Sequence, residues 1–93
     1  MDKDGWRNFL QILAEEQDPK KLEVLSSLLF TAEERDSLAS RIRIIEELLK
    51  GKMTQREIAK KYGVSIAKIT RGSNALKEVS EEMKDFLQNV MRK

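Results

Sequence analysis

The second half of the chain contains two short helical segments joined by a tight turn. Thr54 and Glu57 form a capping box, in which each side chain accepts a hydrogen bond from the other residue's backbone N–H. Gly63 suits the end of the first helix because glycine tolerates a positive φ, and Ser65 is a suitable cap for the next helix. Apolar residues fall where the two helices must pack together: Ile58, Tyr62, Val64 and Ile69. This spacing predicts a helix-turn-helix at about residues 55–77.

The net positive charge of the chain is concentrated on this motif. Between residues 50 and 77, eight residues are basic and one, Glu57, is acidic, which gives +7. The rest of the chain holds ten basic and fifteen acidic residues, or −5, and the two parts restore the formal net charge of +2. A near-neutral protein that gathers its cations on one motif has the electrostatic pattern of a surface that meets phosphates. In a helix-turn-helix, the second helix presents its N-terminal residues to the major groove of DNA.

Amphipathic periodicity predicts further helices on both sides of the motif. The first must stop near Pro19, and its apolar face consists of Trp6, Phe9, Leu10 and Leu13. A second, shorter apolar set follows, at Leu22, Leu25, Leu28 and Leu29. Ser80 starts the last helix, whose stripe is Met83, Phe86, Leu87, Val90 and Met91.

A long helix is predicted immediately before the motif. Thr31 and Glu34 form a second capping box that opens it, and it runs to about Lys50, where Gly51 suits a left-handed end. Its apolar stripe is Leu38, Ile42, Ile45 and Leu49, widened by Ile44 and Leu48. Such a wide stripe is typical of a helix at the centre of a fold.

These segments predict an all-α chain of six helices in a single domain spanning residues 1–93. The helix-turn-helix forms one part, and the remaining helices form a dimerisation core. Several helices are too short to be stable alone, and the first and last have apolar faces with few partners in so small a chain. Association of two chains would cover these faces, so we expect a homodimer.

Composition excludes several classes of protein. The chain is 40% hydrophobic and 37% charged and has no Cys and no His. It therefore has neither a thiolate metal site nor the commonest general base, and no catalytic constellation can be named. We expect no enzymatic activity and no bound metal. Without a signal peptide or an apolar run long enough to span a membrane, the expected location is cytoplasmic, with no membrane partner.

Gly72 departs from the usual motif. It lies in the middle of the second motif helix, where an apolar packing residue is usual, and glycine there costs about 1 kcal/mol relative to alanine. Something must therefore approach the helix closely at this point. A neighbouring helix and a flat ligand are the two interpretations.

The sequence LLFTAEERDSLASRIRIIEELLKGKMTQREIA, followed by IAKITRGSNALK, resembles the Trp repressor family. The resemblance runs from about Leu28 to Lys77, and its most specific element is ITRGSN, residues 69–74. It implies an intertwined all-helical homodimer that binds operator double-stranded DNA. It also implies repression of genes for tryptophan biosynthesis or uptake, with L-tryptophan as corepressor and no other cofactor.

The resemblance also implies a ligand site. Two arginines, matching Arg41 and Arg71, would sandwich the indole, and Arg71 would bind the ligand's carboxylate. The hydroxyl of Thr31 from the other chain would assist, unless this residue serves only as a helix cap. The backbone carbonyls of Leu28 and Phe30 from that chain would accept hydrogen bonds from the ammonium. Gly72 would form a flat floor beside the indole. Ala75 departs from the family pattern, which has a serine there.

For DNA, the resemblance assigns a base contact to Arg56. The start of the recognition helix is formed by Ile66, Ala67, Lys68 and Thr70. The residues that would contact or neighbour phosphates are Gln55, Asn74 and Lys77. For Lys50, Lys60 and Lys61, a solvated charged face is an equal alternative. Two other departures, Ala59 for a lysine and Lys68 for a threonine, bear on the operator sequence.

Two rival functions remain open at this point. One is a constitutive helix-turn-helix regulator that needs no tryptophan, which the departure at Ala75 favours and the pair Arg41 and Arg71 opposes. The other is a helical interaction module whose basic motif binds RNA or an acidic protein. The latter would bind with steep salt dependence but without preference for a palindromic duplex.

Overall fold

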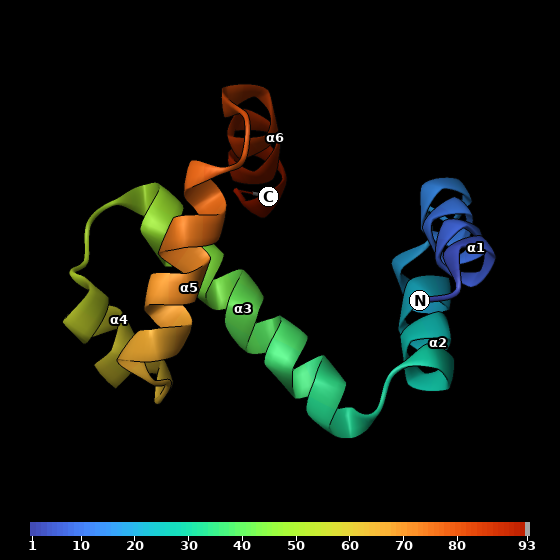
Figure 1. Ribbon diagram of the computed structural model, residues 1–93, viewed down its shortest axis with the longest axis horizontal. Coiled ribbons are helices and arrows are strands. Elements are labelled where there is room, and N and C mark those ends of the chain that lie inside the picture. The colour runs from blue at the N-terminus through green and yellow to red at the C-terminus, as the bar shows by residue number, and fades with distance from the viewer. Residues whose placement is uncertain (93) are drawn as a thin grey trace. The chain divides into compact units, whose positions relative to one another are not determined.

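The computed structural model describes residues 1–92, and all regular structure in that range is helical. The helices are α1 (Lys3–Glu15), α2 (Pro19–Leu29), α3 (Ala32–Lys50), α4 (Gln55–Tyr62), α5 (Ile66–Lys77) and α6 (Glu81–Met91), as Figure 1 shows. The expected all-α chain of six helices is confirmed for this range. Two compact units divide the chain, one ending at Arg35 and the other beginning at Asp36.

The first unit holds α1, α2 and the first turn of α3. Asp18 caps α2, and Pro19 occupies the first turn of that helix. Pro19 therefore begins α2, because the first turn of a helix does not need the N–H that proline lacks. The preceding helix, α1, has already ended at Glu15. The ring of Phe9 meets the ring of Phe30 edge-on, with 5.9 Å between centroids. No residue of α1 or α2 is buried, so this unit has aromatic contacts but no closed core.

The small core of the second unit lies where α3, α4 and α5 meet. Ile44 of α3 is buried, and Ile58 of α4 and Ile69 of α5 are fully buried at 0% exposure. Partly buried side chains surround them: Leu48, Met53, Ala59, Tyr62 and Val64. The packing predicted for the helix-turn-helix is confirmed. One isoleucine from each helix thus attaches the motif to α3.

α3 buries only part of the apolar stripe that was predicted for it. Its buried residues are Ile44 and Glu47, whereas Leu38 and Ile42 are 41% and 49% exposed. Periodicity locates an apolar face, but it does not say which part of that face a neighbour in the same chain covers. Here α4 and α5 cover the side of α3 that carries Ile44 and Glu47.

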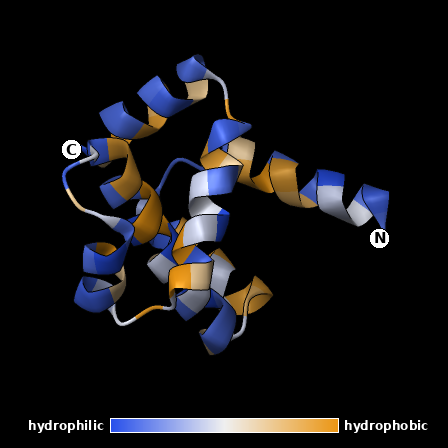
Figure 2. Ribbon diagram, turned by 60° about the vertical axis from the view of Figure 1, so that its left-hand side comes forward, coloured by the Kyte–Doolittle hydropathy of each residue, from blue (hydrophilic) through white to orange (hydrophobic). Residues whose placement is uncertain are grey.

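Apolar side chains remain exposed on both units. Figure 2 colours such apolar residues orange, as in the helix that starts at the N mark. Their exposed fractions lie between 46% and 58%, and they are Trp6, Leu10 and Leu13 of α1 and Met83, Phe86 and Val90 of α6. Apolar surface gathered on a helix face is typical of a surface that a partner covers. Among residues 1–92, no helix combines the length and apolar character that a membrane span requires.

Candidate functional site

The helix-turn-helix is built by local hydrogen bonds at its helix ends. The Oγ1 of Thr54 accepts from the Glu57 N–H at 3.2 Å, and the Oε1 of Glu57 accepts from the Thr54 N–H at 2.9 Å. Gly63 ends α4 with φ of 63°, and the Oγ of Ser65 accepts from the Lys68 N–H at 3.2 Å. The predicted capping box, left-handed turn and second cap are all confirmed. These three devices set the angle at which α5 leaves α4.

The capping box makes the start of α4 sensitive to acid. The backbone N–H of Thr54 and then its side chain hold the pKa of Glu57 below its usual value, and burial opposes them. A carboxylate with a lowered folded pKa stabilises the fold above its unfolded pKa of about 4.3, and this stabilisation is lost as the pH falls through the folded pKa. In Glu57→Gln the amide keeps an acceptor at this position but does not titrate. We expect its melting temperature to fall less steeply than that of the wild type between about pH 6 and pH 2. Equal slopes would show that Glu57 is not an acid-sensitive group.

The residues predicted to contact DNA are all exposed on α4 and α5. They are Gln55, Arg56, Ile66, Ala67, Lys68, Thr70, Asn74 and Lys77. The Oγ1 of Thr70 donates to the Oε1 of Gln55 at 3.2 Å, which ties the N-terminal end of α4 to α5. This bond occupies the side-chain carbonyl of Gln55, and the amide nitrogen keeps its N–H donors for another partner.

Two of the three lysines with an open role bind a carboxylate of this chain. The Nζ of Lys50 lies 3.5 Å from the Oε1 of Glu47, and the Nζ of Lys61 lies 3.4 Å from its Oε2. Within residues 1–92, Lys60 makes no ion pair. The absence of an ion pair at Lys60 fits both interpretations, whereas Lys50 and Lys61 have an internal partner that sequence analysis did not identify.

A cavity of about 440 Å³ opens between α3 and α5. Its wall consists of Ser37, Ser40, Arg41, Ile44 and Ile45 from α3 and Lys68, Arg71, Gly72 and Ala75 from α5. This volume lies in the range of small-molecule sites, about 300–1,000 Å³. The wall combines apolar side chains with three cations and no acidic residue. Such a lining suits a ligand that has an apolar body and a negative charge.

Three of the predicted ligand-binding residues share this wall: Arg41, Arg71 and Gly72. Arg41 comes from α3, and the other two come from α5. A Cβ added at Gly72 would lie 3.2 Å from the Cγ2 of Ile44 and 3.6 Å from the Cδ1 of Leu48. The glycine therefore permits close packing of α5 on α3, and it also lines the cavity.

Sequence analysis missed several residues of the wall. Ser37 precedes Arg41 by four positions, so the two share one face of α3, and this spacing was the available signal. Ser40 carried no comparable signal. Lys68 was expected only at the DNA, but it precedes Arg71 by three positions and therefore shares its side of α5. These additions bring hydroxyls and a third cation to the cavity.

The other predicted ligand-binding residues, Leu28, Phe30 and Thr31, belong to the first unit. The Oγ1 of Thr31 accepts from the Glu34 N–H at 3.1 Å, and the Oε1 of Glu34 accepts from the Thr31 N–H at 2.9 Å. The predicted capping box is confirmed, so Thr31 serves at least as a helix cap. The second unit therefore brings Arg41, Arg71 and Gly72 together, whereas Leu28, Phe30 and Thr31 lie outside it.

Comparison with known proteins gives consistent results. The family model described as Trp repressor protein matches residues 4–91. A Trp operon repressor homolog of Chlamydia caviae is 48% identical over 92 residues, which is 99% of this chain and 91% of the relative. Its counterpart in Chlamydia trachomatis serovar D is 53% identical over 87 residues, or 94% of this chain and 93% of the relative. One from Vibrio parahaemolyticus is 43% identical over 86 residues, or 92% of this chain and 84% of the relative.

Proposed function

Because this chain belongs to the Trp repressor family, a family of transcription regulators, we propose that it represses genes of tryptophan biosynthesis or uptake when L-tryptophan is bound. The chain is a helix-turn-helix DNA-binding regulator and not an enzyme. The tryptophan dependence, the two-chain assembly and the residue roles below are the proposal.

The cavity between α3 and α5 carries this proposal. It places Arg41 and Arg71 in one wall, together with the side-chain-free surface of Gly72. A planar guanidinium stacks on an aromatic face and also pairs with a carboxylate, which are the two features of tryptophan. Arg41 and Arg71 stack on the indole, and Arg71 also binds the carboxylate. This arrangement favours a tryptophan-responsive regulator over a constitutive one.

A second chain completes the ligand site. The hydroxyl of its Thr31 assists at the ligand's carboxylate, and the carbonyls of its Leu28 and Phe30 accept hydrogen bonds from the ammonium. Ala75 of the first chain presents only a methyl group to the cavity. Recognition of the ammonium therefore depends on those carbonyls, and selectivity against indole acids without an amino group is reduced.

The exposed apolar faces of α1 and α6 support an intertwined homodimer. Each face is about half exposed in the single chain, and burying apolar surface is the main favourable term in protein association. The long α3 supplies more such surface, with Leu38 and Ile42 both exposed. Residues 1–93 then act as a single domain whose core is shared between two chains.

At the DNA, Arg56 contacts a base and the start of α5 enters the major groove. Three residues contact the DNA phosphates or lie next to them: Gln55, Asn74 and Lys77. In helix-turn-helix dimers, of which the Trp repressor is a reference example, the two recognition helices meet the duplex one turn apart, ~34–36 Å. Tryptophan under each α5 fixes this spacing, and without it the helices are too mobile or too close together. Coupling between two binding sites is reciprocal, so operator DNA tightens tryptophan binding by the same factor.

Calorimetric titration with L-tryptophan tests the proposal, with indole-3-propionate as comparator. Fluorescence is less suitable because Trp6 and the ligand emit together. Saturable binding of one tryptophan per chain supports the sensor. A titration without saturable heat, at several hundred micromolar protein, would favour the constitutive regulator.

The variant Arg56→Ala separates DNA recognition from ligand binding. Arg56 is exposed on α4 and does not line the cavity, so tryptophan affinity should stay within about twofold of the wild type. Discrimination at one base pair should fall by about 1–3 kcal/mol, the usual value of a side-chain contact to a base edge. Competition binding with single-base operator variants measures this. A variant that still discriminates the same base would contradict the role of Arg56.

A further inference from the structure

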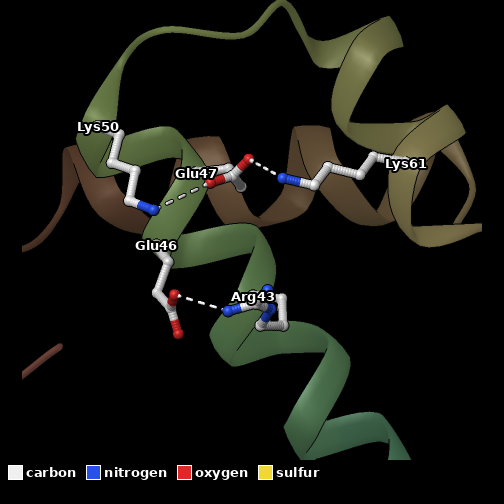
Figure 3. A network of polar contacts seen from close by, with 5 residues as sticks. All are labelled: Arg43, Glu46, Glu47, Lys50 and Lys61. Carbon is white, nitrogen blue, oxygen red and sulfur yellow. Dashed lines mark hydrogen bonds and ion pairs between the residues drawn. The ribbon is translucent and has the colours of Figure 1, made fainter.

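Glu47 is a buried carboxylate between two helices. It lies on α3, it is 5% exposed, and it is the one charged residue of the described range 1–92 that is buried. Figure 3 shows its two oxygens facing different lysines. The Nζ of Lys61 comes from α4, whereas the Nζ of Lys50 comes from the next turn of α3. Glu47 thus joins the first motif helix to the long helix beneath it.

The surroundings keep this carboxylate charged. Burial raises the pKa of Glu47, but the charges and hydrogen bonds of Lys61 and Lys50 outweigh that effect, so the pKa lies below its usual value. A charge that is removed from water persists only when it is paired and hydrogen-bonded. Glu47 is therefore ionised at neutral pH, and its interaction with α4 is an ion pair.

Two polar contacts attach the two ends of α4. At its N-terminal end, Gln55 accepts from Thr70 of α5, and at its C-terminal end Lys61 pairs with Glu47 of α3. Between them lies Ile58, which is fully buried. Apolar burial is non-directional and would tolerate rotation or sliding of an eight-residue helix, whereas hydrogen-bonded pairs specify a geometry. The contacts at its ends therefore define how α4 is oriented.

The ring of Tyr62 reinforces the attachment at the C-terminal end. The guanidinium of Arg43 on α3 lies 5.3 Å from the ring centroid, and the Nζ of Lys61 lies 5.2 Å from it. Both distances are within the range of cation–π attraction. The ion pair and the ring thus hold the same turn of α4 to α3.

From this geometry we infer that Glu47 is a positioning residue for DNA recognition, which holds α4 through Lys61 so that Arg56 and Gln55 meet the duplex in register. It contacts no DNA itself. The pair also neutralises Lys61, a cation that would otherwise attract any phosphate backbone. Loss of the pair lowers the preference for a specific duplex over a random one, because α4 is then no longer held in register. This inference rests on DNA binding through the helix-turn-helix and does not require tryptophan dependence.

The experiment compares two duplexes at fixed salt near 0.15 M, where the Debye length is about 8 Å. One duplex is selected by the wild-type protein with L-tryptophan from a randomised pool, and the other is a scrambled duplex of equal composition. The measured quantity is the Kd for the scrambled duplex divided by the Kd for the selected duplex, so a higher ratio means a stronger preference. The variants are Glu47→Gln, Lys61→Met, the double variant and Lys61→Arg. Lys60→Met is the matched control, because it removes the same charge from the neighbouring position, which makes no ion pair within residues 1–92.

Glu47→Gln and Lys61→Met should each lower this ratio about fivefold, and the double variant should lower it no further. Lys61→Arg should restore the wild-type ratio because arginine keeps the ion pair. Lys60→Met should weaken binding to both duplexes alike and leave the ratio unchanged. An unchanged ratio in both single variants would overturn the inference, and so would additive losses in the double variant. Because Lys61 has an exposed side chain, its variant keeps the test valid even if Glu47→Gln fails to fold.

Hydrogen exchange of the free protein gives a readout that does not depend on DNA. The amides of α4 should exchange about tenfold faster in Lys61→Met than in Lys60→Met, with those of α6 unchanged. Equal exchange in the two variants would overturn the inference. If the wild-type protein selects no duplex from the pool, the proposed DNA recognition is wrong. Faster exchange of the α4 amides in Lys61→Met would then show only that the Glu47–Lys61 pair orders α4.

Discussion

Replacement of Arg71 by alanine should reduce the affinity for L-tryptophan by about 30-fold or more. In the proposed site, the substitution removes a charge-assisted hydrogen bond to the carboxylate, worth about 1.5–3 kcal/mol, and a cation–π contact to the indole, worth about 0.5–2 kcal/mol. Every 1.4 kcal/mol corresponds to tenfold in Kd. In the proposed site, no other residue of the wall both stacks on the indole and binds the carboxylate, so this loss should exceed that of any other alanine substitution there.

Calorimetric titration of Arg71→Ala measures this effect, and Arg92→Ala is the control. Arg92 is also an exposed arginine, but it follows α6 and does not line the cavity between α3 and α5. The control should bind tryptophan as the wild type does, and both variants should keep the wild-type helical content. Wild-type affinity in Arg71→Ala would mean that this cavity is not the tryptophan site.

Truncation of Ile58 to alanine should destabilise the fold by about 2–5 kcal/mol. Ile58 is 0% exposed and lies between α3 and α5, so its loss leaves a cavity at the point where the motif meets the long helix. Proteins of this size are stable by only about 5–15 kcal/mol, so this cost is a large part of the total. Affinity for operator DNA should fall in parallel, because binding requires a folded motif.

Urea unfolding at one fixed protein concentration measures this cost, since the stability of the proposed dimer would depend on concentration. Ile66→Ala is the matched control. It removes the same atoms from a side chain that is 45% exposed, so its cost should stay below about 1 kcal/mol. Equal losses in the two variants would show that Ile58 does not lie in the core that holds the motif to α3.

Signals between neighbouring residues were sufficient to locate the helices. The capping boxes at Thr31 and Thr54 and the left-handed glycine at position 63 were all predicted and all confirmed. Each depends on hydrogen bonds or dihedral angles within about four residues, which amino-acid order alone specifies. The resemblance to the Trp repressor family rested on residues 28–77, and the family match over residues 4–91 confirms it.

Burial was harder to predict than helix boundaries. Leu38 and Ile42 belong to the predicted apolar stripe of α3, yet they are 41% and 49% exposed in the single chain. Glu47 had no apolar character to mark it as buried. Its position depends on Lys61, which is fourteen residues further along the chain. A contact of that kind arises only after the turn that begins at Gly51 has brought α4 back against α3.

The residue order of this chain specifies six helices, their caps and a basic helix-turn-helix, because these depend on short-range hydrogen bonds and on the number of charges. The cavity wall and the Glu47–Lys61 pair required the folded arrangement. Both form where α3 meets a later helix, and such contacts depend on packing between residues that are distant in the chain. Arg41 and Arg71 were recognised through family resemblance, whereas the burial of Glu47 and the place of Ser37 and Lys68 in the cavity wall were found only in the folded arrangement of α3, α4 and α5.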